Sequence, residues 1–279
     1  MNELPIAVLG GGNMGRALIG GLIARGLAPA RIAVGEAVPE QRASLARDFG
    51  VRVHADNLAA IGHAAAVIVA VKPQDVATAL APLAAELART RPLVLSVAAG
   101  VRVRTLQRAC GPDVPVIRAM PNRPALVGAG VSGLFAPDHV PAGPRSLAED
   151  LMRAVGEVVW LRSEDEIDVV TALSGSGPAY FFLLAELMTQ AGVDLGLEPQ
   201  VARTLAVQTL FGAGQLAHAS DGDLARLRAE VTSKGGTTEA ALRAYEAADL
   251  RAIVARAVAA ATQRGGELAR EFDKNHESD

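Results

Sequence analysis

The sequence predicts an α/β protein, with a doubly wound domain over residues 1–160 followed by an all-α domain over residues 161–279. Three observations support this division. Short β-branched runs alternate with amphipathic segments in the first 160 residues, and these runs are apolar almost throughout, as expected for strands covered by helices on both faces. Beyond Trp160, only long helical patterns remain.

The first domain is expected to be built on a mostly parallel sheet. Its predicted strands are residues 6–10, 31–36, 65–71, 92–98 and 114–119, with later strands at 131–135 and 157–161. Its predicted helices include residues 14–25, 39–48 and 74–89.

The second domain is expected to contain helices over residues 178–194, 199–219, 222–229, 237–246 and 249–272. Helix 178–194 reads "PAYFFLLAELMTQAGVD" and has little polar surface. A helix that is apolar nearly all round is buried on every side, so a partner subunit is expected to cover it.

Composition excludes several classes of protein. The formal net charge of -3 and the aromatic content of 3% do not fit a nucleic-acid partner. A single cysteine, Cys110, rules out an internal disulfide, and five scattered histidines predict no metal site. The acidic start "MNELPIAVLG" does not resemble a signal peptide, and no uninterrupted membrane span is predicted, so we expect a cytoplasmic protein without a membrane partner.

The segment "AVLGGGNMG" contains a dinucleotide-binding pattern of glycines directly after the first strand. Gly10 permits a tight turn, Gly12 lets a pyrophosphate approach the backbone, and Gly15 lets the following helix lie close to the strand. The N-terminus of that helix then faces the phosphates. The alternative is a glycine-rich turn without a ligand, which the position after the first strand makes less favoured.

Glu36 ends the second strand, roughly 20 residues after the glycines, where an acid accepts hydrogen bonds from a ribose 2′-hydroxyl. It would repel a 2′-phosphate, which favours NADH over NADPH. Arg42, in the following helix, would soften this charge. A solvated strand end is the alternative interpretation of Glu36.

Two further loops follow strands, at the edge of the sheet where ligands bind. In "AVKPQ" (70–74), Lys72 is a candidate catalytic acid, a ribose ligand or a surface charge. Proton transfer is the least favoured of these, because a lysine must be strongly desolvated to titrate near neutrality. In "RAMPNRPALVGAG" (118–130), Asn122 is a candidate for orienting a carboxamide, or an ordinary turn residue.

The segment "VTSKGGTTEAAL" (231–242) predicts the start of a helix with Thr237 as N-cap. Because Gly235 and Gly236 have no side chains, the helix N-terminus is left bare. With the hydroxyls of Ser233, Thr237 and Thr238, it forms a site of the size of a carboxylate. A plain capped helix is the alternative. The segment "SGSGPAY" (174–180) has a similar composition, with Pro178 at the first helical position, and the two helix starts are predicted to line one pocket.

These segments, together with "SVAAGV" (96–101) and in this order, resemble the pyrroline-5-carboxylate reductases over essentially the whole chain. The resemblance implies reduction of a cyclic imine to L-proline by NADPH or NADH. It implies a Rossmann-like domain, a helical dimerisation domain, and an active site shared between the cofactor domain of one subunit and the helical domains.

The resemblance also assigns residues to ligands. The substrate would be bound by Ser233, Gly236, Thr237 and Thr238. Thr238 would be a catalytic residue near the ring nitrogen, where its hydroxyl would steady the N–H or relay a proton. The cofactor would lie along Asn57, Ala70, Lys72, Ala98 and Asn122, with Asn57 near the adenosine ribose. With the glycine turn and the end of the second strand, the full set of predicted cofactor residues is Gly10, Gly12, Asn13, Met14, Gly15, Glu36, Asn57, Ala70, Lys72, Pro73, Ala98 and Asn122.

The chain differs at three positions from the residues that are common in this family. Arg123 replaces a usual threonine and Lys234 a frequent proline, neither of which removes a predicted donor. Glu36 stands where hydroxyl or basic residues suited to NADPH are common.

Two rival functions remain open at this point. A β-hydroxyacid dehydrogenase would carry a catalytic lysine and a nearby asparagine on the first long helix of the second domain, and helix 178–194 contains neither. A dinucleotide-binding sensor without turnover would need the first domain but not the loop at 231–242.

Overall fold

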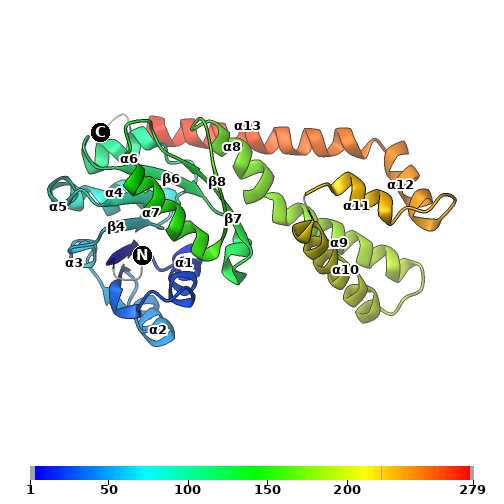
Figure 1. Cartoon of the computed structure of the whole chain (residues 1–279), viewed down its shortest axis with the longest axis horizontal. Helices are drawn as coiled ribbons and strands as arrows, with labels where there is room; N and C mark the ends of the chain where they lie inside the picture. Colours follow the sequence, from blue (N-terminus) through cyan, green and yellow to red (C-terminus); the bar gives the residue numbers. More distant parts are fainter. Residues whose placement is uncertain (1–3, 221, 277–279) are drawn as a thin grey trace. The chain divides into compact units, whose positions relative to one another are not determined.

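The computed structural model describes residues 4–220 and 222–276 (Figure 1). The acidic start at residues 1–3 lies outside the described residues. The chain forms two compact units. One comprises Met1–Gly175 and Ala261–Asp279, and the other comprises Ser176–Ala260.

The first unit is built on an eight-stranded sheet with the strand order β3-β2-β1-β4-β5-β6-β7-β8. All neighbouring strands are parallel except β6 and β7, which are antiparallel. The strands are β1 (Ile6–Leu9), β2 (Ile32–Gly35), β3 (Arg52–His54), β4 (Ala66–Val69), β5 (Leu93–Ser96), β6 (Val116–Met120), β7 (Gly130–Phe135) and β8 (Gly156–Trp160).

Helices cover both faces of this sheet (Figure 1). They are α1 (Asn13–Ala24), α2 (Pro39–Phe49), α3 (Asn57–Ile61), α4 (Val76–Leu80), α5 (Ala84–Thr90), α6 (Val103–Cys110), α7 (Ala142–Met152) and α8 (Glu166–Val170). The predicted α/β class, with a doubly wound first domain and a helical second one, is confirmed.

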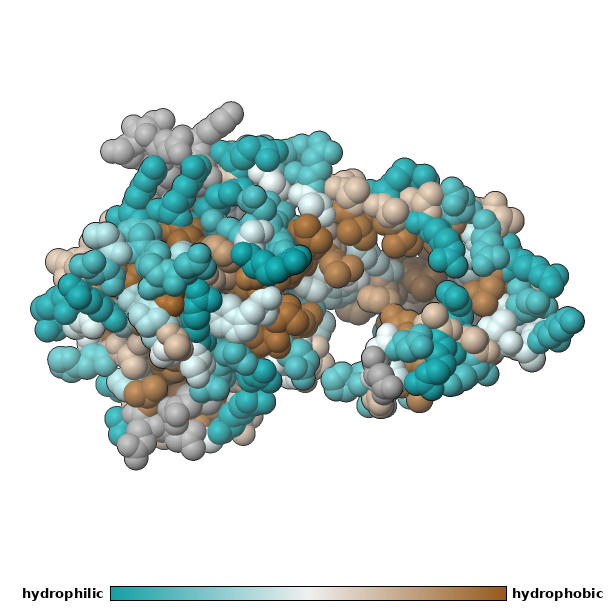
Figure 2. Space-filling view, turned by 45° about the horizontal axis from the view of Figure 1, so that its top comes forward, coloured by the Kyte–Doolittle hydropathy of each residue, from teal (hydrophilic) through white to brown (hydrophobic). Residues whose placement is uncertain are grey.

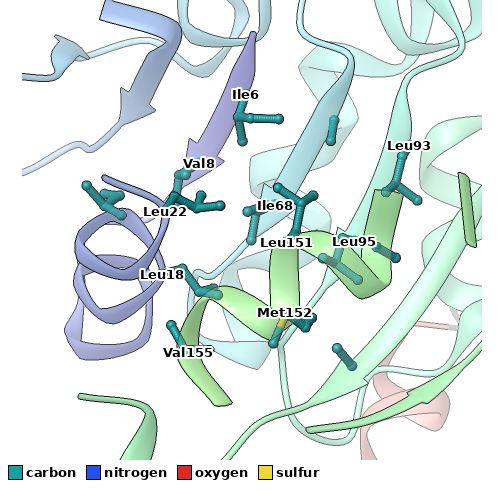
Figure 3. Close-up of a cluster of buried hydrophobic side chains, with 14 of the residues drawn as sticks. Ile6, Val8, Leu18, Leu22, Ile68, Leu93, Leu95, Leu151, Met152 and Val155 are labelled. Atoms are coloured by element: carbon teal, nitrogen blue, oxygen red, sulfur yellow. The ribbon is translucent and has the colours of Figure 1, made fainter. Parts of the chain in front are cut away.

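The two faces of the sheet carry separate hydrophobic clusters because successive side chains of a strand point to opposite faces. Ile6 and Val8 of β1 pack with Leu18 and Leu22 of α1 and with Leu151 of α7 (Figure 3). The other cluster takes alternate residues of the same strands, with helices α4, α5 and α6 covering it. Central strands buried on both faces explain why their sequences read as continuous apolar runs.

Three details of the first unit differ from the sequence prediction. The short edge strand β3 was missed, because its three residues are only partly buried. Strand β7 runs antiparallel to β6, because the short link between them cannot hold the crossover that a parallel pair requires. The predicted helix 74–89 is divided into α4, a 3₁₀ turn at Ala81–Leu83 and α5, because Pro82 lacks the N–H that a continuous α-helix would use.

The boundary between the compact units also differs from the predicted division at 160/161. The first unit continues through α8 to Gly175 and includes the end of α13 (Leu250–His276). α13 passes beside Asp168 of α8, where Cβ atoms added to Gly265 and Gly266 would lie in ordinary contact with it, at 3.6 Å and 3.4 Å. Ala269 is 1% exposed. The predicted boundary was placed after the last strand, but buried residues of the first unit, such as Ile167 and Ala172, continue beyond that strand.

The second unit contains helices and no strand among its described residues. The helices are α9 (Gly177–Asp194), α10 (Pro199–Ala219), α11 (Leu224–Glu230), α12 (Thr237–Ala247) and the first part of α13. Each predicted helix of this region is present, within a few residues at its ends.

We expect Leu18→Ala to lower the free energy of unfolding of the first unit by about 3–5 kcal/mol, because the side chain is fully buried and leaves a cavity. The measurement is urea unfolding followed by the fluorescence of Trp160, the single tryptophan, which lies in the first unit. The control is Leu58→Ala in α3, where the leucine is 45% exposed. Equal losses in the two variants would contradict this account of the core.

Candidate active site

The glycine cluster forms a tight turn between β1 and α1. Gly10 has a φ of 98°, and a Cβ on it would lie 2.8 Å from the carbonyl oxygen of Ala70 at the end of β4. A Cβ on Gly15 would overlap the carbonyl oxygen of Gly10, so glycine there lets α1 lie against the strand. A Cβ on Gly12 meets no atom within 4 Å, so its backbone is open to a ligand.

This turn lies where the sheet changes its direction of winding, because β1 is placed between β2 and β4. Ligands of open α/β sheets bind at the carboxyl ends of strands at such a point. A cleft of about 620 Å³ is present there. Six predicted cofactor residues line it: Gly10, Gly12, Glu36, Asn57, Ala70 and Lys72.

Glu36 is held by the backbone on both sides of its carboxylate. The N–H of Gly11 donates to Oε2 at 2.8 Å, and the N–H of Val38 donates to Oε1 at 2.9 Å. The Nη1 atom of Arg42 donates to the carbonyl oxygens of Glu36 and Ala37, both at 2.7 Å. Glu36 therefore joins the glycine turn to the end of β2, and the interpretation as a merely solvated strand end does not describe it.

The other predicted cofactor residues do not line this cleft. Asn13 is exposed in the first turn of α1, Met14 packs against the core, and Pro73 begins a 3₁₀ turn. Gly15 has the packing role given above, and Ala98 is buried just beyond β5.

Asn122 is 8% exposed and uses both ends of its amide within the protein. Its Oδ1 accepts from the N–H of Val131 at 2.9 Å, and its Nδ2 donates to the carbonyl oxygen of Ser174 at 3.1 Å. These bonds hold the loop after β6 against β7 and the chain after α8. The structure therefore assigns Asn122 a role in holding this loop.

Lys72 is exposed after β4, at the start of the 3₁₀ turn Pro73–Asp75. Its position on the cleft suits a positive charge facing a phosphate or a ribose hydroxyl.

The sequence analysis did not identify all the residues that line the cleft. The cleft is also lined by Gly35, Ala37, Val38, Gln41, Ala55, Asp56, Val71, Asp75, Thr78, Ala79 and Pro82. Several of these residues directly follow β2, β3 or β4, at the carboxyl ends of strands where ligands bind, and this position is the signal that could have found them.

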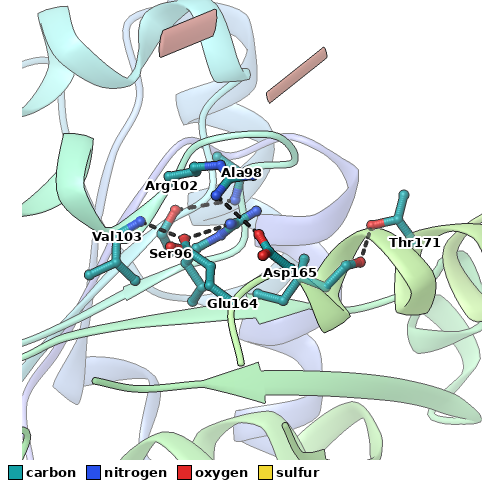
Figure 4. Close-up of polar contacts among 9 residues, drawn as sticks. Ser96, Ala98, Arg102, Val103, Glu164, Asp165 and Thr171 are labelled. Atoms are coloured by element: carbon teal, nitrogen blue, oxygen red, sulfur yellow. Dashed lines mark hydrogen bonds and ion pairs between the residues drawn. The ribbon is translucent and has the colours of Figure 1, made fainter. Parts of the chain in front are cut away.

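A buried ion pair lies at the end of β5 (Figure 4). Oε1 of Glu164 accepts from Nη1 of Arg118 and from the N–H of Val103, both at 2.7 Å. The Arg118 side chain is 5% exposed and that of Glu164 is 19% exposed. The pair joins β6 to the start of α6, and so fixes the α6 end of the loop that contains Ala98. Burial raises the pKa of the neighbouring Asp168 carboxyl, and Arg102 and Arg118 oppose this rise.

The second predicted site is the loop before α12. Gly236, and not the predicted Thr237, is the N-cap, and no side chain caps this helix end. The carboxylate of Glu239 reaches back to the N–H of Gly235 at 2.7 Å instead. The backbone N–H groups of the first turn, which have no partner within the helix, therefore face outward beside Thr237 and Thr238.

A Cβ on Gly236 would lie 2.5 Å from Oγ of Ser233, so this hydroxyl stands directly beside the start of the helix. Ser233, Lys234 and Thr237 are exposed, and Thr238 is half-buried. The structure thus brings together all four residues predicted to bind the substrate.

The segment "SGSGPAY" does not form a second bare helix N-terminus as predicted. Thr171–Gly175 form a π-helical turn that joins α8 to α9, and Pro178 is the second residue of α9. Backbone N–H groups at this point follow a preceding helix, so they are not presented as a free N-terminus. The composition of the two segments is similar, but a turn of π-helix replaces the expected cap.

Comparison with known proteins agrees with this arrangement. A family model described as pyrroline-5-carboxylate reductase dimerisation matches residues 164–268. A second model, described as NADP oxidoreductase coenzyme F420-dependent, matches residues 5–100. Pyrroline-5-carboxylate reductase from Pseudomonas aeruginosa is 45% identical over 272 residues, which are 98% of this chain and 99% of that protein. The chain belongs to the pyrroline-5-carboxylate reductase family.

Other reductases are similar along their whole length. The pyrroline-5-carboxylate reductase from Vibrio alginolyticus is 40% identical over 98% of this chain and 100% of its own. The solved structure of the enzyme from Coxiella burnetii has a TM-score of 0.92 and 40% identity, covering 96% of this chain and 99% of that one. The Plasmodium falciparum enzyme, with NADP bound, has a TM-score of 0.83 and 25% identity, covering 96% of this chain and 99% of its own.

The second unit exposes many large apolar side chains (Figure 2). On α9, Phe181 and Phe182 are each 59% exposed and Leu187 is 57% exposed. The stretch Glu166–Asp194 is long and apolar enough to cross a membrane, which for a single such stretch is a weak indication. Since the dimerisation model matches this region, the family relationship supports self-association as the reason for its exposure.

We expect Glu164→Ala to destabilise the first unit by about 3–5 kcal/mol, because it leaves the buried Arg118 guanidinium without its partner. Urea unfolding followed by Trp160 fluorescence measures the change. The matched control is Asp165→Ala, which removes the 79% exposed partner of Arg102 and should cost about 1 kcal/mol or less. Similar effects in the two variants would show that the Glu164 pair does not hold this part of the sheet.

Proposed function

We propose that this chain reduces 1-pyrroline-5-carboxylate to L-proline, with the dinucleotide in the cleft beside β1 and the substrate carboxylate at the N-terminus of α12. Family membership is the observation that carries the reaction. The glycine turn and the open backbone of Gly12 support the cofactor position, and the uncapped helix supports the carboxylate position.

The cleft fits a nicotinamide dinucleotide on local grounds. The glycine turn brings the N-terminus of α1 to the end of β1, where its free N–H groups and positive dipole end favour a pyrophosphate. Glu36 and Asn57 stand on the same cleft at the ribose end. When bound, the dinucleotide supplies the hydride.

The start of α12 fits a carboxylate for the same reason that α1 fits a phosphate. Gly236 has no side chain to block the approach, and the outward N–H groups at Thr237 and Thr238 are charge-complementary to an anion. Fixing the carboxylate fixes the ring, and orientation alone contributes up to roughly 7–11 kcal/mol to lowering a barrier.

Thr238 is the residue we assign to the ring nitrogen. A protonated imine is already electrophilic, so the site needs a group that orients the N–H rather than a strong acid. The hydroxyl of Thr238 is half-buried in the first turn of α12 and can serve both as donor and as acceptor. For Lys72, whose side chain is exposed, we assign a role in cofactor binding in place of proton transfer.

The apolar surface of the second unit is assigned to a partner subunit of the same kind, which makes the chain at least a homodimer in the cytoplasm. No nucleic acid or membrane enters this proposal.

The reaction is tested by following the oxidation of NADH and of NADPH by pure protein with pyrroline-5-carboxylate. A folded sample that oxidises neither cofactor with this substrate would refute the proposed function.

For the substrate loop, we expect Thr238→Ala to lower kcat/KM by roughly 10–100-fold, about 1.4–2.7 kcal/mol, because it removes a hydrogen bond near the reacting nitrogen. Thr237→Ala is the matched control and should have a mild effect, because it leaves the backbone donors in place. Gly236→Val should be more severe than either, since its side chain would meet Ser233 and fill the space of the anion.

Dinucleotide binding should change little in these variants, because the cleft residues belong to the first unit. If Gly236→Val folds and associates normally but keeps its KM for the imine, the carboxylate is bound elsewhere.

For self-association, we expect Leu187→Glu on α9 to convert the protein to a smaller species, because it places a charge among exposed apolar residues. Sedimentation velocity at micromolar concentration measures the change. Leu58→Glu, which alters a leucine of comparable exposure in the first unit, should sediment as the wild type. A wild-type chain that is a stable monomer would contradict this assignment.

A further inference from the structure

We propose that the cleft selects NAD(H) over NADP(H), and that Glu36, fixed by the glycine turn, is the residue that makes this selection. The inference rests on the proposed function for the position of the dinucleotide. It goes beyond that function by naming which of the two cofactors the chain takes.

The first step is that the carboxylate of Glu36 is oriented before any ligand arrives. Gly11 and Val38 each donate a backbone N–H to a different oxygen of this carboxylate. A carboxylate has about four lone-pair sites, so about two remain for the hydroxyls of a ribose. Because the side chain is already ordered, accepting a 2′-hydroxyl costs little further conformational entropy.

The second step is that moving the Glu36 carboxylate away from this position costs free energy. If a 2′-phosphate displaced it, the N–H groups of Gly11 and Val38 would each lose an acceptor. The glycine turn that receives the pyrophosphate would lose a support at the same time. If the carboxylate stayed, it would face an added phosphate with a charge of about -1.5 to -2 at close range.

The third step concerns the cations that could offset this repulsion. Arg42, on α2 beside Glu36, uses its Nη1 atom to bind two backbone carbonyl oxygens. Arg16 and Arg47 both pair with Asp48. The Arg42 guanidinium is therefore held at the backbone of residues 36 and 37, and the charges of Arg16 and Arg47 are shared with Asp48.

The charged residues that line the cleft also favour the cofactor without a 2′-phosphate. The acidic residues that line it are Glu36, Asp56 and Asp75, and the single basic one is Lys72. Lys72 follows β4, whereas the ribose end of the cleft lies beside β2, next to Glu36. The wall is thus suited to a neutral hydroxyl at the 2′ position and not to a further dianion.

The test is calorimetric titration of the full-length protein with NAD⁺ and NADP⁺ in the absence of substrate, repeated with 5′-AMP and adenosine 2′,5′-bisphosphate. We expect the ligand without the 2′-phosphate to bind at least ten-fold more tightly in each pair. Glu36→Gln keeps the shape of the side chain but removes its charge, and it should reduce this ratio at least ten-fold.

Two further variants sharpen the result. Glu40→Gln removes an equal charge from the first turn of α2, at a residue that does not line the cleft, and it should leave the ratio unchanged. Arg42→Ala should weaken the binding of NAD⁺ and NADP⁺ by the same factor. A selective loss of NADP⁺ binding in Arg42→Ala would overturn the inference, because it would show that Arg42 binds the 2′-phosphate.

The wild-type ratio tests the selection even if Glu36→Gln does not fold. Equal or tighter binding of the 2′-phosphorylated ligands overturns the inference, and so does a ratio that Glu36→Gln leaves unchanged. Turnover of the imine with equal kcat/KM for NADH and NADPH would overturn the inference but leave the proposed function intact. Failure to bind either dinucleotide would overturn the proposed function itself.

Discussion

The close approach of Gly10 to the end of β4 is the contact on which the rest of the site depends. No side chain fits between the Gly10 backbone and the carbonyl of Ala70, so β1 and β4 end side by side. This proximity opens the cleft between the ends of β2 and β4 and directs the start of α1 towards it. Glu36 then completes the turn by binding the N–H of Gly11. The glycine turn, whose backbone is placed to bind the pyrophosphate, and Glu36, which is placed to bind the ribose, are thus joined by a hydrogen bond.

Most of the first unit could be predicted because its strands are buried on both faces. An apolar run such as residues 65–71 leaves few alternatives for β4, and the glycine spacing determined the position of the turn. The edge strand β3 was not predictable in the same way, because its residues are only partly buried and pair with a single neighbour. The direction of β7 depends on a connection length, which hydrophobic periodicity does not report.

The candidate site shows a similar limit. Residues that act through their backbone, such as Gly12 and Gly236, could be found from the sequence, because each belongs to a short glycine-containing motif at the start of a helix. Residues whose role depends on distant partners could not. Asn122 binds Val131 and a carbonyl 52 residues away, and Glu164 joins Arg118 to Val103. Thr237 and Gly236 could not be distinguished as cap, because both residue types are favoured there.

Helix α13 has a consequence for the way the protein is made. The chain leaves the first unit after Gly175 and returns to it at Ala261, where Ala269 is buried and Phe272 packs against the sheet side that α4, α5 and α6 cover. A ribosome that adds about 5–20 residues per second needs roughly ten seconds to synthesise the intervening segment. During that interval the apolar side chains that Phe272 contacts lack this cover, which arrives only after the segment beyond Ala261 has been synthesised.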